Sequence, residues 1–357
     1  MGFESFIGNP KAVSAVRDML AAGRVPHALL FTGHDGVGKK TLAIMLAKAV
    51  NCERMGADFC GECASCRKVA ETLAASHEDL AQRRGIKESA RRVEGLIYFD
   101  VQLIEPLTRY ILIEQIRRLR NVAYTRPFEL KRRVLIVDQA QAIHWQAIDL
   151  LLKVLEEPPD TTTLVLVCPN AFEIRPTLRS RCRRVRFTFV EEATLREVLA
   201  KEGRLNDAHR ALVARLAGGS LVKARSLNLV DFQSRRRPWL DYLESLTSGG
   251  AGSASGVNWK MLFDSAKTLA EDREQFEENL RVGYDLCSDL LRLLEGQPES
   301  SILNVDVAAR LKAWAPKLGL AGILTLKNGL DDAYRLQTRN VNQQLGLETL
   351  AIQLAGD

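Results

Sequence analysis

A glycine-rich loop between a short apolar run and a helical pattern constrains the fold of this chain more than any other feature. The apolar run ALLFT covers residues 28–32, and the loop GHDGVGKKT follows at once over residues 33–41. Its spacing nearly matches the motif G-x-x-x-x-G-K-[ST], whose backbone N–H groups converge on phosphate oxygens at a helix N-terminus. The sequence therefore predicts a strand, a phosphate-binding loop and a helix, in that order.

The loop supplies five candidate residues for contacting a nucleotide: Gly33, Gly36, Gly38, Lys39 and Thr41. The glycines bring backbone N–H groups to the phosphates, and Lys39 would reach the β- and γ-phosphates. Lys40, however, stands where the motif places a Ser or Thr hydroxyl on Mg²⁺, and a protonated amine cannot ligate a cation. Thr41 lies roughly 100° further around the helix and cannot replace that hydroxyl. The loop therefore argues against Mg²⁺-dependent hydrolysis and leaves open whether ATP or ADP still binds.

The first half of the chain alternates strand and helix patterns. Two further apolar runs, residues 134–138 and 163–168, predict buried strands. Helical patterns occur at residues 41–52, 113–123 and 145–157. This alternation predicts a parallel sheet covered on both faces, and the polar–apolar alternation of residues 183–189 predicts a half-exposed strand. Beyond residue 190 the pattern is helical, with a linker expected at Arg235–Pro238.

The run at 134–138 ends in the second element that a nucleotide site requires. An apolar strand ending in an acid helps to position a metal, and Asp138 is that acid here. The next residue should be a glutamate that polarises water, but it is Gln139, which is a poor general base. We therefore include Asp138 among the candidate nucleotide-site residues and regard the site as degenerate.

Composition excludes several classes of protein. The 357 residues are 46% hydrophobic, and 50 basic against 44 acidic side chains leave a charge of +6, as in soluble globular proteins of two or three domains. No apolar run approaches the roughly 18–20 residues that cross a bilayer, and the N-terminus lacks a signal-peptide pattern. We expect a cytoplasmic protein without a membrane partner.

Four of the seven cysteines form a compact cluster with the spacing Cys52-x7-Cys60-x2-Cys63-x2-Cys66. In a reducing compartment this spacing favours a metal over disulfides, and four thiolates fit a closed, structural Zn²⁺ site. Four unrelated thiols and an iron–sulfur cluster are the alternatives. The remaining residues, Cys168, Cys182 and Cys287, are expected to be buried small hydrophobic side chains.

These motifs together resemble the AAA+ clamp-loader subunits of bacterial DNA polymerase III, and among them the δ′ type. The resemblance rests on the phosphate loop, VLIVDQA (134–140), LLKVLEEPP (151–159), LRSRC (178–182) and RNVNQQLGLETL (339–350). The cysteine cluster is similar to the zinc module of those subunits. Their sensor-2 stretch resembles G-S-x-R-x-A, which reads GSLVKA here, so that Val222 replaces the phosphate-sensing arginine.

The resemblance implies an AAA+ fold in three domains. Residues 1–188 would form the α/β nucleotide-binding-type domain with its zinc module. Residues 189–234 would form a small helical lid, and residues 235–357 an all-helical collar that joins the oligomer.

The resemblance also implies a role exercised on a neighbouring subunit. LRSRC is similar to the S-R-C motif, in which the arginine of one subunit projects into the ATP site of the next, and this makes Arg181 a candidate arginine finger in trans. The implied function is that of a non-hydrolysing δ′ subunit that scaffolds the loader during loading of the sliding clamp. The implied partners are the δ and γ/τ subunits, the sliding clamp, and primer–template DNA within the complex.

Two other functions stay open at this point. One is an active γ/τ-like clamp-loader ATPase, and the other is a zinc-dependent nucleic-acid-binding module unrelated to clamp loading. Residues 78–95, rich in Arg and Glu, resemble an insertion without an assigned role.

Overall fold

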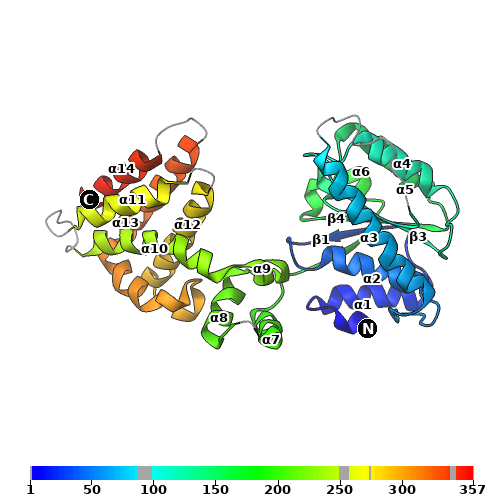
Figure 1. Ribbon diagram of the computed structural model, residues 1–357, viewed down its shortest axis with the longest axis horizontal. Helices are drawn as coiled ribbons and strands as arrows, with labels where there is room; N and C mark the ends of the chain where they lie inside the picture. Colours follow the sequence, from blue (N-terminus) through cyan, green and yellow to red (C-terminus); the bar gives the residue numbers. More distant parts are fainter. Residues whose placement is uncertain are drawn as a thin grey trace. The chain divides into compact units, whose positions relative to one another are not determined.

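The computed structural model describes residues 2–86, 99–203, 205–248, 257–272, 275–337 and 343–356. It divides into two compact units (Figure 1). The first comprises Met1–Leu195 and Gly218–Lys223, and the second Arg196–Ala217 and Ala224–Asp357. The three-domain division stays a prediction.

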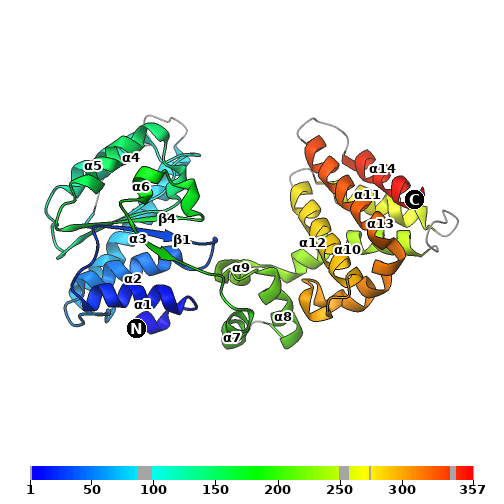
Figure 2. The same cartoon turned by 180° about the vertical axis from the view of Figure 1, so that it is seen from behind.

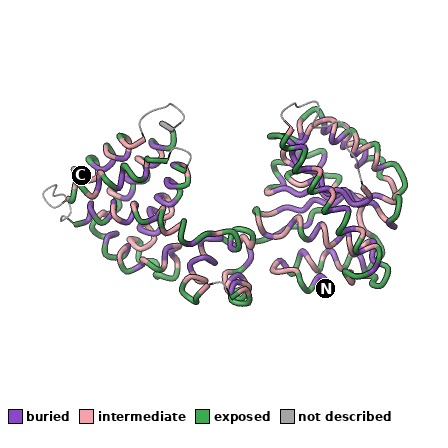
Figure 3. Tube along the Cα trace, viewed as in Figure 1, coloured by how far each residue is buried: buried purple, intermediate pink, exposed green. Residues whose placement is uncertain are grey.

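The first unit is built on a parallel sheet of five strands in the order β2-β3-β4-β1-β5. The strands are β1 (Ala28–Thr32), β2 (Val101–Ile104), β3 (Arg133–Val137), β4 (Thr162–Cys168) and β5 (Arg183–Arg186). Every residue of β1 to β4 is buried, whereas β5 is mostly exposed (Figure 3). The predicted parallel α/β class is therefore confirmed. The sequence patterns missed only β2, which spans four residues.

Helices cover both faces of this sheet, as Figures 1 and 2 show. They are α1 (Pro10–Ala21), α2 (Lys39–Asn51), α3 (Ala64–Gly85), α4 (Ile113–Ala123), α5 (Ile148–Glu156) and α6 (Pro176–Arg179). Along β1, Leu29 and Phe31 pack into the core formed with α1 to α3, while Leu30 packs into the core formed with α4 to α6. Side chains of both parities are thus buried, which explains why the strands are apolar throughout.

A buried ion pair joins two neighbouring strands at their amino ends. Arg133 is fully buried, and its Nη2 lies 3.0 Å from Oδ1 of Asp100. The same carboxylate accepts hydrogen bonds of 2.8–3.1 Å from the backbone N–H groups of residues 128–130. Burial by itself raises the pKa of Asp100, but these N–H groups and the guanidinium outweigh it and hold that pKa below its ordinary value.

We expect Asp100→Asn to lower the free energy of unfolding at neutral pH by about 3–5 kcal/mol, because it leaves Arg133 buried without its counter-charge. The depressed pKa means that this stabilisation is present above the unfolded-state pKa of about 3.9 and is lost as pH falls through the lower folded-state pKa. Urea unfolding followed by circular dichroism should show the loss. The exposed Asp149→Asn serves as a control. Equal stability of the Asp100→Asn and wild-type chains would contradict the prediction.

The second unit contains helices and no strand in its described residues. Its helices are α8 (Asp207–Leu216), α10 (Leu229–Thr247), α11 (Trp259–Ala270), α12 (Phe276–Leu294), α13 (Ala308–Gln337) and α14 (Gln343–Gly356). Two helices cross the division between the units, α7 (Glu192–Glu202) and α9 (Leu221–Ser226). The core of the second unit contains Trp239, whose indole N–H donates to the carbonyl of Asn279 at 2.7 Å. No helix in the described part of the chain is long and apolar enough to cross a membrane.

The prediction of a linker at Arg235–Pro238 is wrong, because these residues lie inside α10. Arg236 is buried there and donates to Oδ1 of Asn304 and to Oδ1 of Asp306, each at 2.8 Å. Partners about seventy residues away thus accommodate a charge that the local sequence presents as solvent-exposed.

Of the insertion expected at 78–95, residues up to 85 belong to α3, and residues 87–95 lie outside the described residues. Residues 339–342 of the C-terminal motif also lie outside them.

Candidate functional site

The phosphate loop lies between β1 and α2, with Gly38 as the residue that precedes the helix. Gly36 and Gly38 have φ angles of +77° and +95°, in the region that favours glycine. A Cβ on Gly36 would lie 1.9 Å from Oγ of Ser220, and one on Gly38 would lie 2.7 Å from the ring of Phe6. The glycines are therefore required both by the backbone conformation and by segments that pack closely against the loop.

Lys39 points back into this loop. Its side chain is only 6% exposed, and Nζ donates to the backbone carbonyls of Gly33 and His34, the latter at 2.7 Å. Nζ also lies 3.3 Å from Oδ1 of Asp35, which is exposed. An ammonium group at the centre of a loop before a helix N-terminus suits an anion, as the sequence motif predicts.

Lys40 forms ion pairs with two acidic residues that follow neighbouring strands. Its Nζ lies 2.8 Å from Oε1 of Glu105, which follows β2, and 3.3 Å from Oδ2 of Asp138, which follows β3. Burial lowers the pKa of Lys40, but the hydrogen bond to Glu105 and the two carboxylate charges outweigh it, so the pKa is raised. The lysine is therefore fully protonated at neutral pH and holds the two carboxylates together.

Gln139 and Val222, which replace a glutamate and an arginine that hydrolysis would require, lie close to Asp138 and to the loop respectively. Gln139 has a left-handed backbone, and its N–H donates to Oδ1 of Asp138 at 3.0 Å. The stretch that contains Val222 contacts the loop directly, because the N–H of Leu221 donates to the carbonyl of Gly36 at 3.0 Å. Val222 is 63% exposed and has no charge. Lys40, Gln139 and the stretch that contains Val222 therefore all contact the phosphate loop or Asp138. Thr41, the remaining candidate residue of the loop, is exposed on α2.

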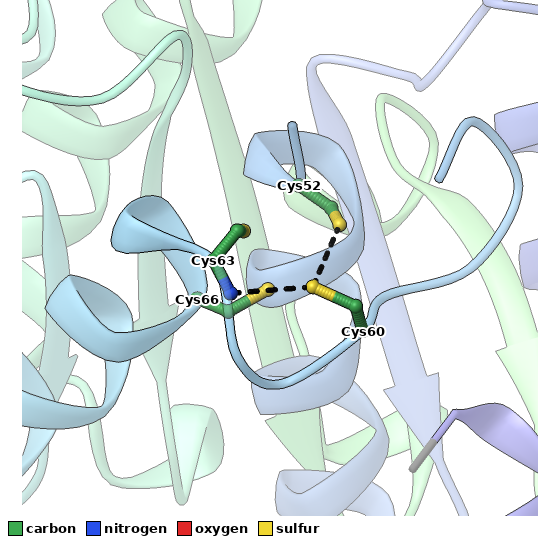
Figure 4. Close-up of side chains that lie close together, drawn as sticks. All are labelled: Cys52, Cys60, Cys63 and Cys66. Atoms are coloured by element: carbon green, nitrogen blue, oxygen red, sulfur yellow. Dashed lines mark hydrogen bonds between the residues drawn. The ribbon is translucent and has the colours of Figure 1, made fainter. Parts of the chain in front are cut away.

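The four clustered cysteines converge at the end of α2 and the start of α3 (Figure 4). Their sulfurs all lie within 4.8 Å of one another, and those of Cys52 and Cys60 are 3.8 Å apart. A tetrahedral zinc ion with Zn–S bonds of about 2.3 Å would place its sulfurs about 3.8 Å apart, so this donor set fits zinc. Hydrogen bonds, chiefly the one involving the backbone of Glu53, lower the pKa of Cys63 to about 6.

The three other cysteines lie outside this cluster. Cys168 and Cys287 are buried and Cys182 is half-buried, and burial raises the pKa of each thiol, as expected for small hydrophobic side chains.

Arg181 lies near the amino ends of the parallel strands, whereas the phosphate loop lies at their carboxyl ends. It precedes the amino end of β5, whereas the loop follows the carboxyl end of the parallel neighbour β1, and strands of this length span roughly 13–17 Å. Its guanidinium lies 2.7 Å from Oε1 of Glu156 and donates to the carbonyl of Thr177 at 3.0 Å. Both partners of the ion pair are well exposed, so the arginine is available to a neighbouring molecule and is remote from the loop of its own chain.

Sequence reasoning missed Glu105 as a site residue. Glu105 follows β2 directly, and because β2 was not predicted, the carboxylate at the end of that strand was not recognised. Arg84 of α3, which donates to Oε2 of Glu105 at 2.7 Å, was likewise missed, since nothing local connects it to the loop.

The sequence profile described as "DNA polymerase III, delta subunit" matches residues 8–191, which is just over half of the chain. The chain belongs to this family. Among curated relatives, the gamma/tau subunit of DNA polymerase III from Mycobacterium tuberculosis is 30% identical over 228 residues, 61% of this chain and 35% of the relative. The tau subunit from Escherichia coli is 30% identical over 233 residues, 63% of this chain and 32% of the relative. The chain thus spans about a third of the length of these relatives.

Two solved structures from Thermotoga maritima resemble the chain distantly. A DNA polymerase III gamma subunit-related protein is 15% identical with a TM-score of 0.43, over 96% of this chain and 98% of that one. The Holliday junction branch migration motor RuvB is 17% identical with a TM-score of 0.41, over 89% of each chain.

Proposed function

We propose that this chain is a non-hydrolysing, δ′-type subunit of the DNA polymerase III clamp loader that donates Arg181 to the ATP site of a neighbouring γ/τ-type subunit. The family match and the relationship to gamma/tau subunits support a place in the loader. The observation that carries the proposal is the pairing of Lys40 with Asp138 and Glu105, in the position where hydrolysis requires a metal.

Hydrolysis of ATP on such a loop requires three groups that this chain lacks. Lys40 replaces the hydroxyl that holds Mg²⁺, Gln139 replaces the carboxylate that polarises water, and Val222 replaces the arginine that senses phosphate. Each substitution removes a different part of the machinery, and all three residues contact or flank the same loop and strand end. We therefore expect no intrinsic catalysis, while ATP or ADP binding is retained.

Arg181 would act on another subunit's nucleotide. A guanidinium stabilises the charge on the phosphoryl group during its transfer, and an arginine supplied in trans does so in related enzymes. Release of Arg181 from Glu156 requires little free energy, because an exposed ion pair contributes only about 0–1 kcal/mol. The partners are then the δ and γ/τ subunits, the sliding clamp, and primer–template DNA within the assembly. The helical second unit would contribute to the oligomeric collar.

Reconstitution tests the proposal. The isolated chain should show no ATP turnover above background with Mg²⁺, and a loader assembled from γ/τ and δ should need this chain for clamp-loading ATPase. Turnover by the isolated chain at ordinary AAA+ rates would favour the alternative of an active γ/τ-like ATPase. Steeply salt-dependent DNA affinity of the lone chain would instead favour a separate nucleic-acid-binding module.

A further inference from the structure

We propose that the phosphate loop of this chain binds the phosphates of ADP or ATP without a divalent cation, because the ammonium of Lys40 permanently occupies the cation position. The inference deepens the proposed function, since it states the metal requirement of the same degenerate loop. Lys40 does more than remove the hydroxyl that would ligate Mg²⁺, because its ammonium group supplies a positive charge in the position of the ion.

The carboxylate oxygens that a divalent ion would need are already engaged. In Glu105, Oε1 contacts Lys40 at 2.8 Å and Oε2 accepts from Arg84 at 2.7 Å. In Asp138, Oδ2 contacts Lys40 at 3.3 Å and Oδ1 accepts from the N–H of Gln139 at 3.0 Å. Each of the four oxygens therefore has a donor. Mg²⁺ requires an octahedral set of oxygen ligands at about 2.0–2.1 Å, and an ion on these oxygens would lie directly beside the Lys40 ammonium that already contacts both carboxylates.

The charges in the site balance without a metal. Lys40 and Arg84 carry two positive charges, and Glu105 and Asp138 carry two negative ones. The two carboxylates are largely buried, with side chains 9% and 17% exposed, so an unbalanced charge here would be unfavourable. Adding a divalent cation would create an excess of positive charge beside the ammonium, so the residues present do not fit the ion that the motif implies.

The loop nevertheless keeps the groups that bind phosphate. Gly36 and Gly38 have the positive φ angles that glycine adopts readily, and α2 begins directly after Gly38. Lys39, buried in the loop, provides a second ammonium group, and its contact with the exposed carboxylate of Asp35 at 3.3 Å is one that a phosphate oxygen would replace. The two carboxylates account for two of the three N–H groups of the Lys40 ammonium, which leaves one for a phosphate oxygen. An anion therefore meets two ammonium groups where an ordinary loop presents one ammonium and a metal.

The test measures ADP binding to the full chain by isothermal titration calorimetry, once with excess Mg²⁺ and once with EDTA. We expect dissociation constants that agree within about threefold. A constant that is weaker by about tenfold or more in EDTA would overturn the proposal. Absence of ADP binding in both buffers at millimolar nucleotide would overturn it as well.

Three variants assign the effect to Lys40. Lys40→Thr restores the hydroxyl of the motif, and we expect Mg²⁺ to strengthen its ADP binding by about tenfold over EDTA. Lys40→Arg keeps the charge and should remain indifferent to Mg²⁺. Lys48→Thr removes a lysine from the same helix away from the loop, and should behave as the wild type.

Thermal unfolding shows whether each variant folds. If Lys40→Thr does not fold, the wild-type measurements with Mg²⁺ and with EDTA decide by themselves whether the loop needs a divalent cation. A folded Lys40→Thr chain that gains no Mg²⁺ dependence would overturn the assignment to Lys40. Because these measurements use the isolated chain, their failure leaves the role of Arg181 in a neighbouring site untouched, and that role is tested separately in the assembled loader.

Discussion

Replacing Arg181 by alanine is expected to lower ATP turnover at the neighbouring subunit's site by about 10³-fold or more, because the charge on the transferring phosphoryl group loses its guanidinium partner. The loss should appear in the rate of turnover and not in the assembly of the complex, since the guanidinium of Arg181 is exposed and, within the described residues, hydrogen-bonds only to Glu156 and Thr177. A rapid-quench measurement on a reconstituted loader resolves the effect. In a loader reconstituted with several ATPase subunits, the burst of hydrolysis should lose the contribution of one site.

Two variants separate a catalytic arginine from a structural one. Arg183→Ala removes an exposed arginine two residues away on β5 and should leave the burst unchanged. Glu156→Gln removes the ion pair but keeps the guanidinium, and should also leave the burst intact. A loss in Glu156→Gln equal to that in Arg181→Ala would mean that the arginine acts through its pair with Glu156. An unchanged burst in Arg181→Ala would refute the finger itself.

Loss of the zinc site should destabilise the first unit strongly. The four sulfurs connect the end of α2 to the start of α3, and three of the four cysteines are buried in the core beside the sheet. We expect Cys63→Ser to lower the free energy of unfolding on the order of 5 kcal/mol, part of the ~10–16 kcal/mol with which structural zinc binds small zinc domains. In a domain of this size, that corresponds to a fall in Tm of about 10–20 °C.

Metal analysis and thermal unfolding check this prediction together. The wild-type chain should contain one zinc ion, and chelation should reproduce the stability loss of Cys63→Ser. Cys182→Ser, which changes a half-buried thiol of the same unit outside the cluster, should keep both the ion and most of the stability. Visible absorption from iron, or a metal-free chain of unchanged Tm, would contradict a structural zinc site.

Local pattern was enough to predict most of the first unit. The apolar runs at β1, β3 and β4 and the helix at 113–123 depend on periodicity within a few residues, and the structure confirms them. The same holds for the half-exposed β5. The pattern failed where it was short or ambiguous. β2 has four residues, and Arg235–Pro238 reads as a polar break although Arg236 is buried inside α10.

For the candidate site, too, the sequence was enough to predict some features, and others depended on the tertiary structure. Sequence alone was enough to predict a phosphate loop with a lysine in place of a metal ligand, a four-cysteine cluster and an arginine in a recognisable motif. Only the tertiary structure decided what these residues contact. Lys40 contacts Glu105, which is 65 positions away in the sequence, and Gly36 packs closely against Ser220. Arg181 forms its ion pair with Glu156. The physical reason is that strand order and register, which bring the ends of β2 and β3 beside the loop, depend on the packing of the whole sheet. A missing metal ligand is therefore visible in the sequence, but the cation that replaces the metal is visible only in the fold.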